Sequence, residues 1–280
     1  DEQDVEVAGL AVMLAVFAVA FLAGPLVTIA LFALSSALAL REFATAVQWQ
    51  PIRRRLMVAG FAFVIPVQYL LIAMEWYGMF SIFVPVYAFL IMTSLAAGQE
   101  DVDGFLPRIA TLHLGLMLCV YCLSHAPALM LLKIPDYSAA NPAVNALLLF
   151  YLMLVVQISD VMQYVFGKLF GRRKIAPIVS PSKTVEGFFG GGAAAVAIGA
   201  AMYWITPFTP WQAAGLSTII VFSGFMGGLA MSAIKRSVGA KDWGTMISGH
   251  GGVLDRLDSV IFAAPVFFHA VHHFYVPGRI

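Results

Sequence analysis

The chain has 280 residues, of which 61% are hydrophobic and 11% charged, with a formal net charge of +1 and a mean hydropathy of +0.90. Its 16 basic and 15 acidic side chains are too few to cover the surface of a soluble protein of this length. Apolar runs long enough to cross a hydrocarbon core of about 30 Å recur along the sequence, without the period-two alternation of a transmembrane β-barrel. The composition therefore predicts an all-α, polytopic transmembrane protein.

The hydropathy pattern predicts about nine transmembrane helices. They lie near residues 8–23, 26–40, 57–73, 79–97, 109–131, 143–166, 188–206, 212–233 and 259–276. Gly24-Pro25 separates the first two, which favours a tight hairpin or a kinked pair of helices. We expect two regions: residues 1–140 as a hydrophobic frame of helices, and residues 141–280 as the part that carries the functional site.

The distribution of basic residues predicts the orientation. When residues 232–258 are placed in the cytosol, fourteen of the 16 basic residues fall on that side, and only Lys133 and Arg279 fall on the other. Basic residues concentrate in the cytosolic loops of membrane proteins. The N-terminus and a polar site at the cytosolic face are therefore expected inside, and the C-terminus outside.

Asp160 lies near the cytosolic end of the span predicted at 143–166. An ionisable group in a transmembrane segment is a candidate for function, because a charge is costly to place there. Gln157, Asp160 and Tyr164 are spaced i, i+3 and i+7, so they share one helical face. The alternative is a carboxylate that reaches the membrane surface or pairs with Lys168.

Residues 167–192, GKLFGRRKIAPIVSPSKTVEGFFGGG, carry five basic side chains directly before a glycine-rich helix start. Residues 180–186 are typical of a helix N-terminus with a hydroxyl cap. Such a terminus binds phosphate well when a lysine lies nearby, although the spacing is not that of a P-loop. For residues 172–174, contact with anionic lipid explains the charge as well as a functional role does. The residues predicted to bind substrate here are Ser180, Lys183 and Thr184.

The most polar stretch is residues 232–258, SAIKRSVGAKDWGTMISGHGGVLDRLD, between two apolar runs. It holds four basic side chains, three carboxylates, a histidine and five glycines. Basic side chains neutralise a polyphosphate, and glycines let backbone N–H groups approach it closely. The stretch therefore predicts a phosphate- and metal-handling site, in preference to a loop of mutually paired charges. The residues concerned are Lys235, Arg236, Lys241, Asp242, His250, Gly251, Gly252, Asp255, Arg256 and Asp258.

The carboxylates of this stretch predict a Mg²⁺ site. Asp255 and Asp258 are three residues apart and project from one face of a helix, and Asp242 lies on the preceding loop. Mg²⁺ binds few protein carboxylates and completes its shell with water and substrate phosphates. No Ser-His-acid or thiol-base arrangement indicates a covalent nucleophile. Phosphoryl or nucleotidyl transfer needs none, because positioning and charge neutralisation do most of the work.

The pattern S-x-I-K-R-x4-K-D-x-G-x5-H-G-G-x-x-D-R-x-D over residues 232–258 resembles the signature of the phosphatidate cytidylyltransferases, or CDP-diacylglycerol synthases. Upstream, Ser159-Asp160, G-K-x-x-G-R at 167–172 and S-P-x-K-T-x-E-G at 180–187 resemble other segments of that family in the same order. The resemblance covers residues ~150–276 well. Over the first 140 residues it is limited to a hydrophobic frame that includes R-E-F at 41–43.

The resemblance implies a Mg²⁺-dependent reaction of CTP with phosphatidate that yields CDP-diacylglycerol and pyrophosphate, with a second cation as an option. It implies an enzyme of an inner, cytoplasmic membrane, surrounded by membrane lipids, without a nucleic-acid partner and with a homodimer as an option. Metal binding would fall to Asp242, Asp255, Asp258 and Asp160, and the triphosphate or leaving pyrophosphate to Lys235, Arg236, Lys241 and Arg256. His250 would contact a phosphate oxygen or a carboxylate.

Departures from the family pattern at Ser182, at Ser248 and in the segment 161–163 suggest a divergent branch, with an acceptor other than ordinary phosphatidate as an option. The alternatives are a related membrane nucleotidyl- or phosphotransferase that acts on another lipid phosphate or on a polyprenol, and a transporter or non-catalytic scaffold. A transporter is the less favoured of these, because the sequence shows no internal repeat or pair of broken helices.

Overall fold

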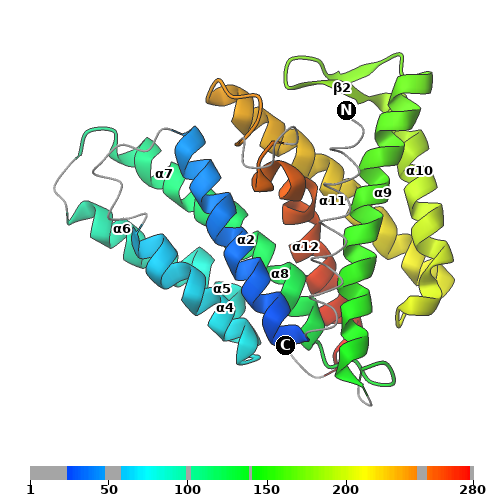
Figure 1. Cartoon of the computed structure of the whole chain (residues 1–280), viewed down its shortest axis with the longest axis horizontal. Coiled ribbons are helices and arrows are strands. Elements are labelled where there is room, and N and C mark those ends of the chain that lie inside the picture. The colour runs from blue at the N-terminus through cyan, green and yellow to red at the C-terminus, as the bar shows by residue number, and fades with distance from the viewer. Residues whose placement is uncertain (1–23, 48–57, 99–101, 139–140, 245–250, 278–280) are drawn as a thin grey trace. The chain divides into compact units, whose positions relative to one another are not determined.

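The computed structural model describes residues 24–47, 58–98, 102–138, 141–244 and 251–277. The chain divides into two compact units, which we call the first unit (Asp1–Pro127 and Asp242–Arg256) and the second unit (Ala128–Lys241 and Leu257–Ile280). The described residues form helices and a single two-stranded hairpin (Figure 1). The predicted division into residues 1–140 and 141–280 concerns roles along the sequence and stays a prediction.

The first unit is built from helices that are joined end to end. Its described elements are α2 (Pro25–Ala46), η2 (Gly60–Val64) with α4 (Ile65–Ala73), α5 (Tyr77–Ile82) with η3 (Phe83–Ala88) and α6 (Phe89–Ala97), and α7 (Phe105–Leu116) with η4 (Met117–Cys122) and α8 (Leu123–Ala128). Helix α2 starts at Pro25, directly after Gly24 with φ +90°, as the predicted break requires.

Hydrogen bonds of buried hydroxyl groups connect α2 and α4 in the first unit. The Ser36 and Tyr69 hydroxyls lie 2.6 Å apart, and the Tyr69 hydroxyl donates to the Phe32 carbonyl at 3.0 Å. Helix α7 lies close to α2, and Gly115 permits this contact, since a Cβ atom there would stand only 2.9 Å from the Phe43 ring. The Ser36 and Tyr69 hydroxyls thus find hydrogen-bond partners within the protein, as polar groups in apolar surroundings require.

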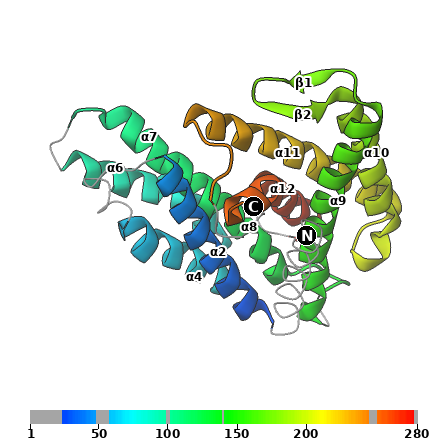
Figure 2. The same ribbon diagram turned by 45° about the horizontal axis from the view of Figure 1, so that its top comes forward.

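The second unit contains the long helices of the C-terminal half. Its described elements are η5 (Leu129–Leu131), η6 (Pro142–Asn145), α9 (Ala146–Phe170), β1 (Lys174–Ala176), β2 (Ser180–Thr184), α10 (Val185–Ala201), η7 (Tyr203–Ile205) and α11 (Pro210–Ser237). Helix α12 (Val253–Tyr275) contributes its first turn to the first unit and the remainder to the second. Figures 1 and 2 show α9 and α10 side by side, with the antiparallel β1–β2 hairpin at the end where α9 stops and α10 starts.

Glycines of α10 allow its close contact with α9. A Cβ atom at Gly191 would overlap the backbone of Met162 and Gln163, and one at Gly187 would stand 2.6 Å from the Gln163 carbonyl oxygen. Only residues without a side chain permit such an approach of two helix backbones, which is a common basis of helix packing in membranes. The glycine-rich start of α10 is therefore a packing surface against α9.

The helices agree with most of the predicted membrane spans. Within the described residues, six helices are long and apolar enough to cross a membrane, and two shorter apolar helices, Gly60–Ala73 and Val185–Ala201, accompany them. Each of these helices overlaps one predicted span, whereas the first predicted span, 8–23, lies outside the described residues. The all-α polytopic fold is thus confirmed, and the count of nine stays a prediction.

The segment before α10 partly follows the sequence prediction. Thr184 is the N-cap of α10, and its hydroxyl accepts a hydrogen bond from the Gly187 N–H at 3.1 Å, as the capping pattern predicts. Ser180 and its neighbours, however, form strand β2 before the helix starts, and Ala176 pairs with Ser180 in the hairpin.

Replacement of Gly191 by alanine is expected to destabilise the protein, because the new methyl group overlaps the α9 backbone. We expect a loss of about 1–3 kcal/mol, which lowers the melting temperature by several degrees. The control is Gly215→Ala on α11, where a Cβ atom meets nothing within 4 Å. Thermal unfolding of the detergent-solubilised variants measures the difference, and equal melting of the two would contradict the close contact.

Candidate functional site

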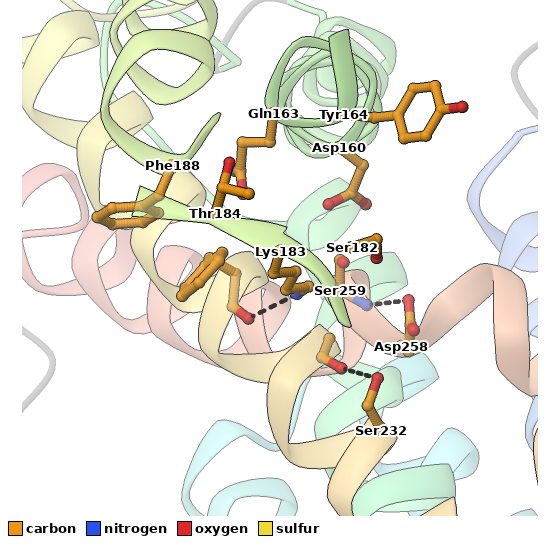
Figure 3. A pocket seen from close by; sticks show the side chains of 12 residues that line it. Asp160, Gln163, Tyr164, Ser182, Lys183, Thr184, Phe188, Ser232, Asp258 and Ser259 are labelled. Carbon is orange, nitrogen blue, oxygen red and sulfur yellow. Dashed lines mark hydrogen bonds between the residues drawn. The ribbon is translucent and has the colours of Figure 1, made fainter. Parts of the chain in front are cut away.

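A cavity of about 230 Å³ opens in the second unit among α9, the hairpin, α10, α11 and α12 (Figure 3). Its wall mixes carboxylate, ammonium, hydroxyl and aromatic groups. The residues that line it are Asp160, Gln163, Tyr164, Ser182, Lys183, Thr184, Phe188, Phe225, Gly228, Ser232, Asp258 and Ser259. A polar enclosure of this kind in a largely apolar protein marks a candidate site.

The Lys183 ammonium group lies inside this cavity. It donates to the Phe225 carbonyl at 3.1 Å and stands 4.5 Å from the centroid of the Phe225 ring. Burial lowers the pKa of Lys183 from its ordinary value, and the Asp160 and Asp258 carboxylates oppose that shift. The ammonium therefore shares the cavity with two acidic groups, and it has donor capacity left for a further acceptor.

Two carboxylates from different helices line the same cavity as this lysine. Asp160 comes from α9 and Asp258 from α12, and Figure 3 shows the Asp160 carboxylate pointing into the cavity. The Ser259 hydroxyl is hydrogen bonded to Asp160, and the Ser259 N–H donates to Asp258 Oδ1 at 2.7 Å. The serine thus orders both carboxylates, which otherwise repel each other.

Local sequence explains why Lys183 reaches the cavity. Thr184 ends strand β2 and caps α10, so the residue before it is fixed in an extended conformation beside α11. On α11, a Cβ atom at Gly228 would stand only 2.7 Å from Lys183 Nζ. The missing side chain at Gly228 therefore provides the space for the ammonium group.

The structure brings together some of the predicted site residues in this cavity, namely Asp160, Lys183, Thr184 and Asp258. Ser180 is buried at the start of β2 and does not line the cavity. Lys235, in the last turn of α11, is close enough to lower the pKa of Lys183 further. Four other predicted site residues are exposed, each at the surface of the unit to which it belongs: Arg236, Lys241, Asp242 and Arg256. His250 lies outside the described residues.

In the first unit, Glu42 of α2 caps the start of α12. Its side chain is 5% exposed, and its two carboxylate oxygens accept from the Val253 N–H at 2.9 Å and the Leu254 N–H at 2.8 Å. A carboxylate at a helix N-terminus satisfies unpaired N–H groups and is favoured by the helix dipole. Sequence reasoning missed Glu42, although an acidic residue in the last turn of an apolar span is a recognisable signal.

Residues of the predicted core stretch surround this cap. The Asp255 carboxylate accepts from the Trp243 N–H at 2.8 Å and from the Gly252 N–H at 3.0 Å. A Cβ atom at Gly252 would overlap the Glu42 carboxylate, and Gly251 has φ +75°. These contacts explain both glycines by packing and backbone conformation, and their predicted role at a substrate phosphate stays a prediction.

The donor set of the cavity suits a hard divalent cation. Asp160 and Asp258 supply two carboxylates, with the Ser232 hydroxyl on the same wall. Mg²⁺ is commonly held by one or two carboxylates, with water and substrate phosphates as its other ligands. Within the described ranges, no three acidic, histidine or cysteine residues gather into a larger cation site. Asp160 and Asp258 are therefore the pair that fits Mg²⁺, and Asp242 and Asp255 stay predictions as ligands.

Comparisons with known proteins agree on one family. Residues 6–274 match the Cytidylyltransferase family. Over 250 residues the chain is 39% identical to "Uncharacterized protein YnbB" of Escherichia coli (strain K12). This match covers 88% of this chain and 79% of that protein. It is 40% identical over 118 residues to phosphatidate cytidylyltransferase of Staphylococcus aureus (strain COL), and 39% identical over 118 residues to that of Staphylococcus haemolyticus (strain JCSC1435). Each of these two matches spans 41% of this chain and 45% of the relative.

The fold and the cavity define a helical integral membrane protein with enclosed acidic and basic side chains. The chain belongs to the cytidylyltransferase family, because the family match extends over nearly all of it. Membership of this family supports a membrane nucleotidyltransferase.

Replacement of Glu42 by alanine is expected to destabilise the start of α12. The variant leaves the N–H groups of Val253 and Leu254 without their acceptor, at a cost of about 1–3 kcal/mol. Glu42→Gln keeps one acceptor oxygen and should lose less. Thr45→Ala, an exposed position of α2, is the control. Thermal unfolding in detergent measures the order, and a Glu42→Ala variant as stable as Thr45→Ala would refute the cap.

Proposed function

We propose that the protein transfers the CMP group of CTP to phosphatidate, with CDP-diacylglycerol and pyrophosphate as products. The observation that carries the proposal is the enclosure of Lys183 with Asp160 and Asp258 at the end of a membrane helix, in a chain of the cytidylyltransferase family. The identity with phosphatidate cytidylyltransferases supports the choice of lipid, although the match spans less than half of their length.

The reaction joins two polyanions, so charge is its main obstacle. A phosphate oxygen of phosphatidate attacks the α-phosphorus of CTP, a new P–O bond forms, and the bond to the β-phosphate breaks as pyrophosphate leaves. Lys183 is placed to bind a phosphate oxygen and offset this charge, because its ammonium already lies in the cavity. No covalent intermediate with a protein side chain is needed.

Asp160 and Asp258 would hold Mg²⁺, which when bound supplies neutralisation of the developing phosphate charge. The remaining predicted roles belong to the same proposal. Thr184, Ser180, Gly251 and Gly252 would contact substrate, Asp242 and Asp255 would support the metal, and His250 would contact a phosphate or a carboxylate. The side chains proposed for the triphosphate are Lys235, Arg236, Lys241 and Arg256.

We place the enzyme in a bacterial inner membrane with the site on the cytosolic side. The concentration of basic residues on one side supports this orientation. CTP would then arrive from the cytosol, and phosphatidate from the surrounding lipid. A homodimer and a second cation are further parts of this proposal.

Purified protein in detergent micelles is expected to release pyrophosphate only when CTP, phosphatidate and Mg²⁺ are all present. Asp160→Asn and Asp258→Asn should each lower this rate by about 100-fold or more, because each removes a charge from the proposed Mg²⁺ site. Thr218→Ala, at an exposed position of α11, is the matched control and should keep full activity.

Other outcomes discriminate among the alternatives. Release with CTP and another lipid phosphate, but not with phosphatidate, would replace the acceptor and give weight to the departures at Ser182 and Ser248. Release with ATP in place of CTP would indicate a phosphotransferase. Full activity in both aspartate variants would remove the cavity from the mechanism.

A further inference from the structure

One end of the second unit carries a surface that the proposed reaction does not use. The last turn of α9 and the segment that joins it to β2 expose four basic side chains and three large apolar ones. We call this set the basic hairpin surface: Lys168, Arg172, Arg173, Lys174, Leu169, Phe170 and Ile178. Ile178, between the two strands, is 89% exposed. Exposed apolar groups of this size beside basic ones are unusual on a surface that meets only water.

Positive charge dominates this surface. Residues 167–184 contain no aspartate or glutamate. The nearest carboxylate, Glu186, accepts from the backbone N–H groups of Arg172 and Arg173 at 2.9 Å and 3.1 Å, and these bonds lower the pKa of Glu186 below its ordinary value. Glu186 thus fixes the backbone where α9 ends, while both arginine side chains stay exposed.

The surface lies where lipid headgroups are expected. Helix α9 belongs to a candidate membrane span that ends at Phe170, so the residues that follow leave the hydrocarbon layer there. The opposite end of α10 leads to Trp204 and Trp211, which are 72% and 87% exposed. Tryptophans of this kind mark a membrane–water interface. Figures 1 and 2 show the hairpin and the turn from α10 to α11 at opposite ends of the α9–α10 pair.

We propose that the basic hairpin surface binds the headgroups of anionic phospholipids in the membrane around the protein. The basic side chains attract the phosphate groups, and Ile178 and Phe170 enter the apolar layer below them. A surface of basic and apolar side chains without acidic ones is attracted more strongly to an anionic bilayer than to a zwitterionic one. Each arginine side chain can also donate to two phosphate oxygens at once, which strengthens the contact.

The hairpin connects this surface with the cavity. Strand β1 pairs with β2, and β2 carries Ser182, Lys183 and Thr184 into the cavity wall. Anionic lipid held at the hairpin is therefore concentrated next to Lys183. This consequence, unlike the binding itself, rests on the proposed function, in which the acceptor is an anionic lipid.

Lipid binding by the intact protein tests the proposal without any measurement of activity. Detergent-solubilised protein is titrated with phosphatidylglycerol, and bound lipid is counted by native mass spectrometry. The triple variant Arg172→Gln, Arg173→Gln and Lys174→Gln should bind phosphatidylglycerol about 100-fold more weakly, because each basic side chain near a membrane contributes about fivefold. Binding of phosphatidylcholine should not change.

Three comparisons make the result specific. The charge-preserving variant Arg172→Lys, Arg173→Lys and Lys174→Arg should retain phosphatidylglycerol binding, and Lys133→Gln, a basic residue away from the hairpin, should also retain it. Inorganic phosphate at the same concentration should not displace the lipid. Equal phosphatidylglycerol binding by the glutamine variant and the wild type would overturn the proposal, and so would displacement of the lipid by inorganic phosphate.

The consequence for the reaction has its own readout. In mixed micelles, the glutamine variant should raise the KM for phosphatidate more than it lowers kcat. If the wild type binds anionic lipid at the hairpin but releases no pyrophosphate, the proposed function fails and the lipid surface stands. If pyrophosphate is released but the glutamine variant binds lipid normally, the lipid surface fails and the proposed function stands.

Discussion

The Lys183 ammonium shares one cavity with the Asp160 and Asp258 carboxylates, and the candidate site of the second unit depends on this arrangement of charges. A charge taken out of water is costly unless opposite charges and hydrogen bonds replace the solvent. Here the compensation comes from two helices and a backbone carbonyl, and the required space comes from Gly228. This arrangement of charges is costly to assemble and requires tertiary structure. It thereby differs from a loop of mutually paired surface charges, which water stabilises without any tertiary structure.

Close helix packing supplies the geometry for this group of charges. Gly187 and Gly191 bring the α10 backbone against α9, and Thr184 fixes the direction in which the chain enters α10. The strand before the helix then delivers Lys183 to the cavity that Asp160 reaches from α9. The glycines thus act on the site indirectly, through the distance between two helices.

The first unit also contains polar groups that need partners in an apolar surrounding, and there a carboxylate supplies them. The N–H groups at the start of α12 lack partners within the helix, and the buried Glu42 carboxylate accepts from two of them. Asp255 binds the N–H groups of Trp243 and Gly252 in the same way. In an apolar protein, carboxylates therefore serve backbone structure as well as chemistry, and the residue type alone does not reveal which.

Sequence patterns were enough to predict the class of protein and some of the residues that line the cavity. Hydropathy predicted the helical membrane fold, because a bilayer requires long apolar segments whatever their arrangement. An ionisable group in an apolar span indicated Asp160, a basic helix start indicated Lys183, and the most polar stretch indicated Asp258. The three-dimensional structure was needed to show which of the predicted charges share a cavity, that residues 180–184 form a strand, and that Glu42 caps α12. The reason is physical: Glu42 and Leu254 are 212 residues apart, and local patterns carry no information about such contacts.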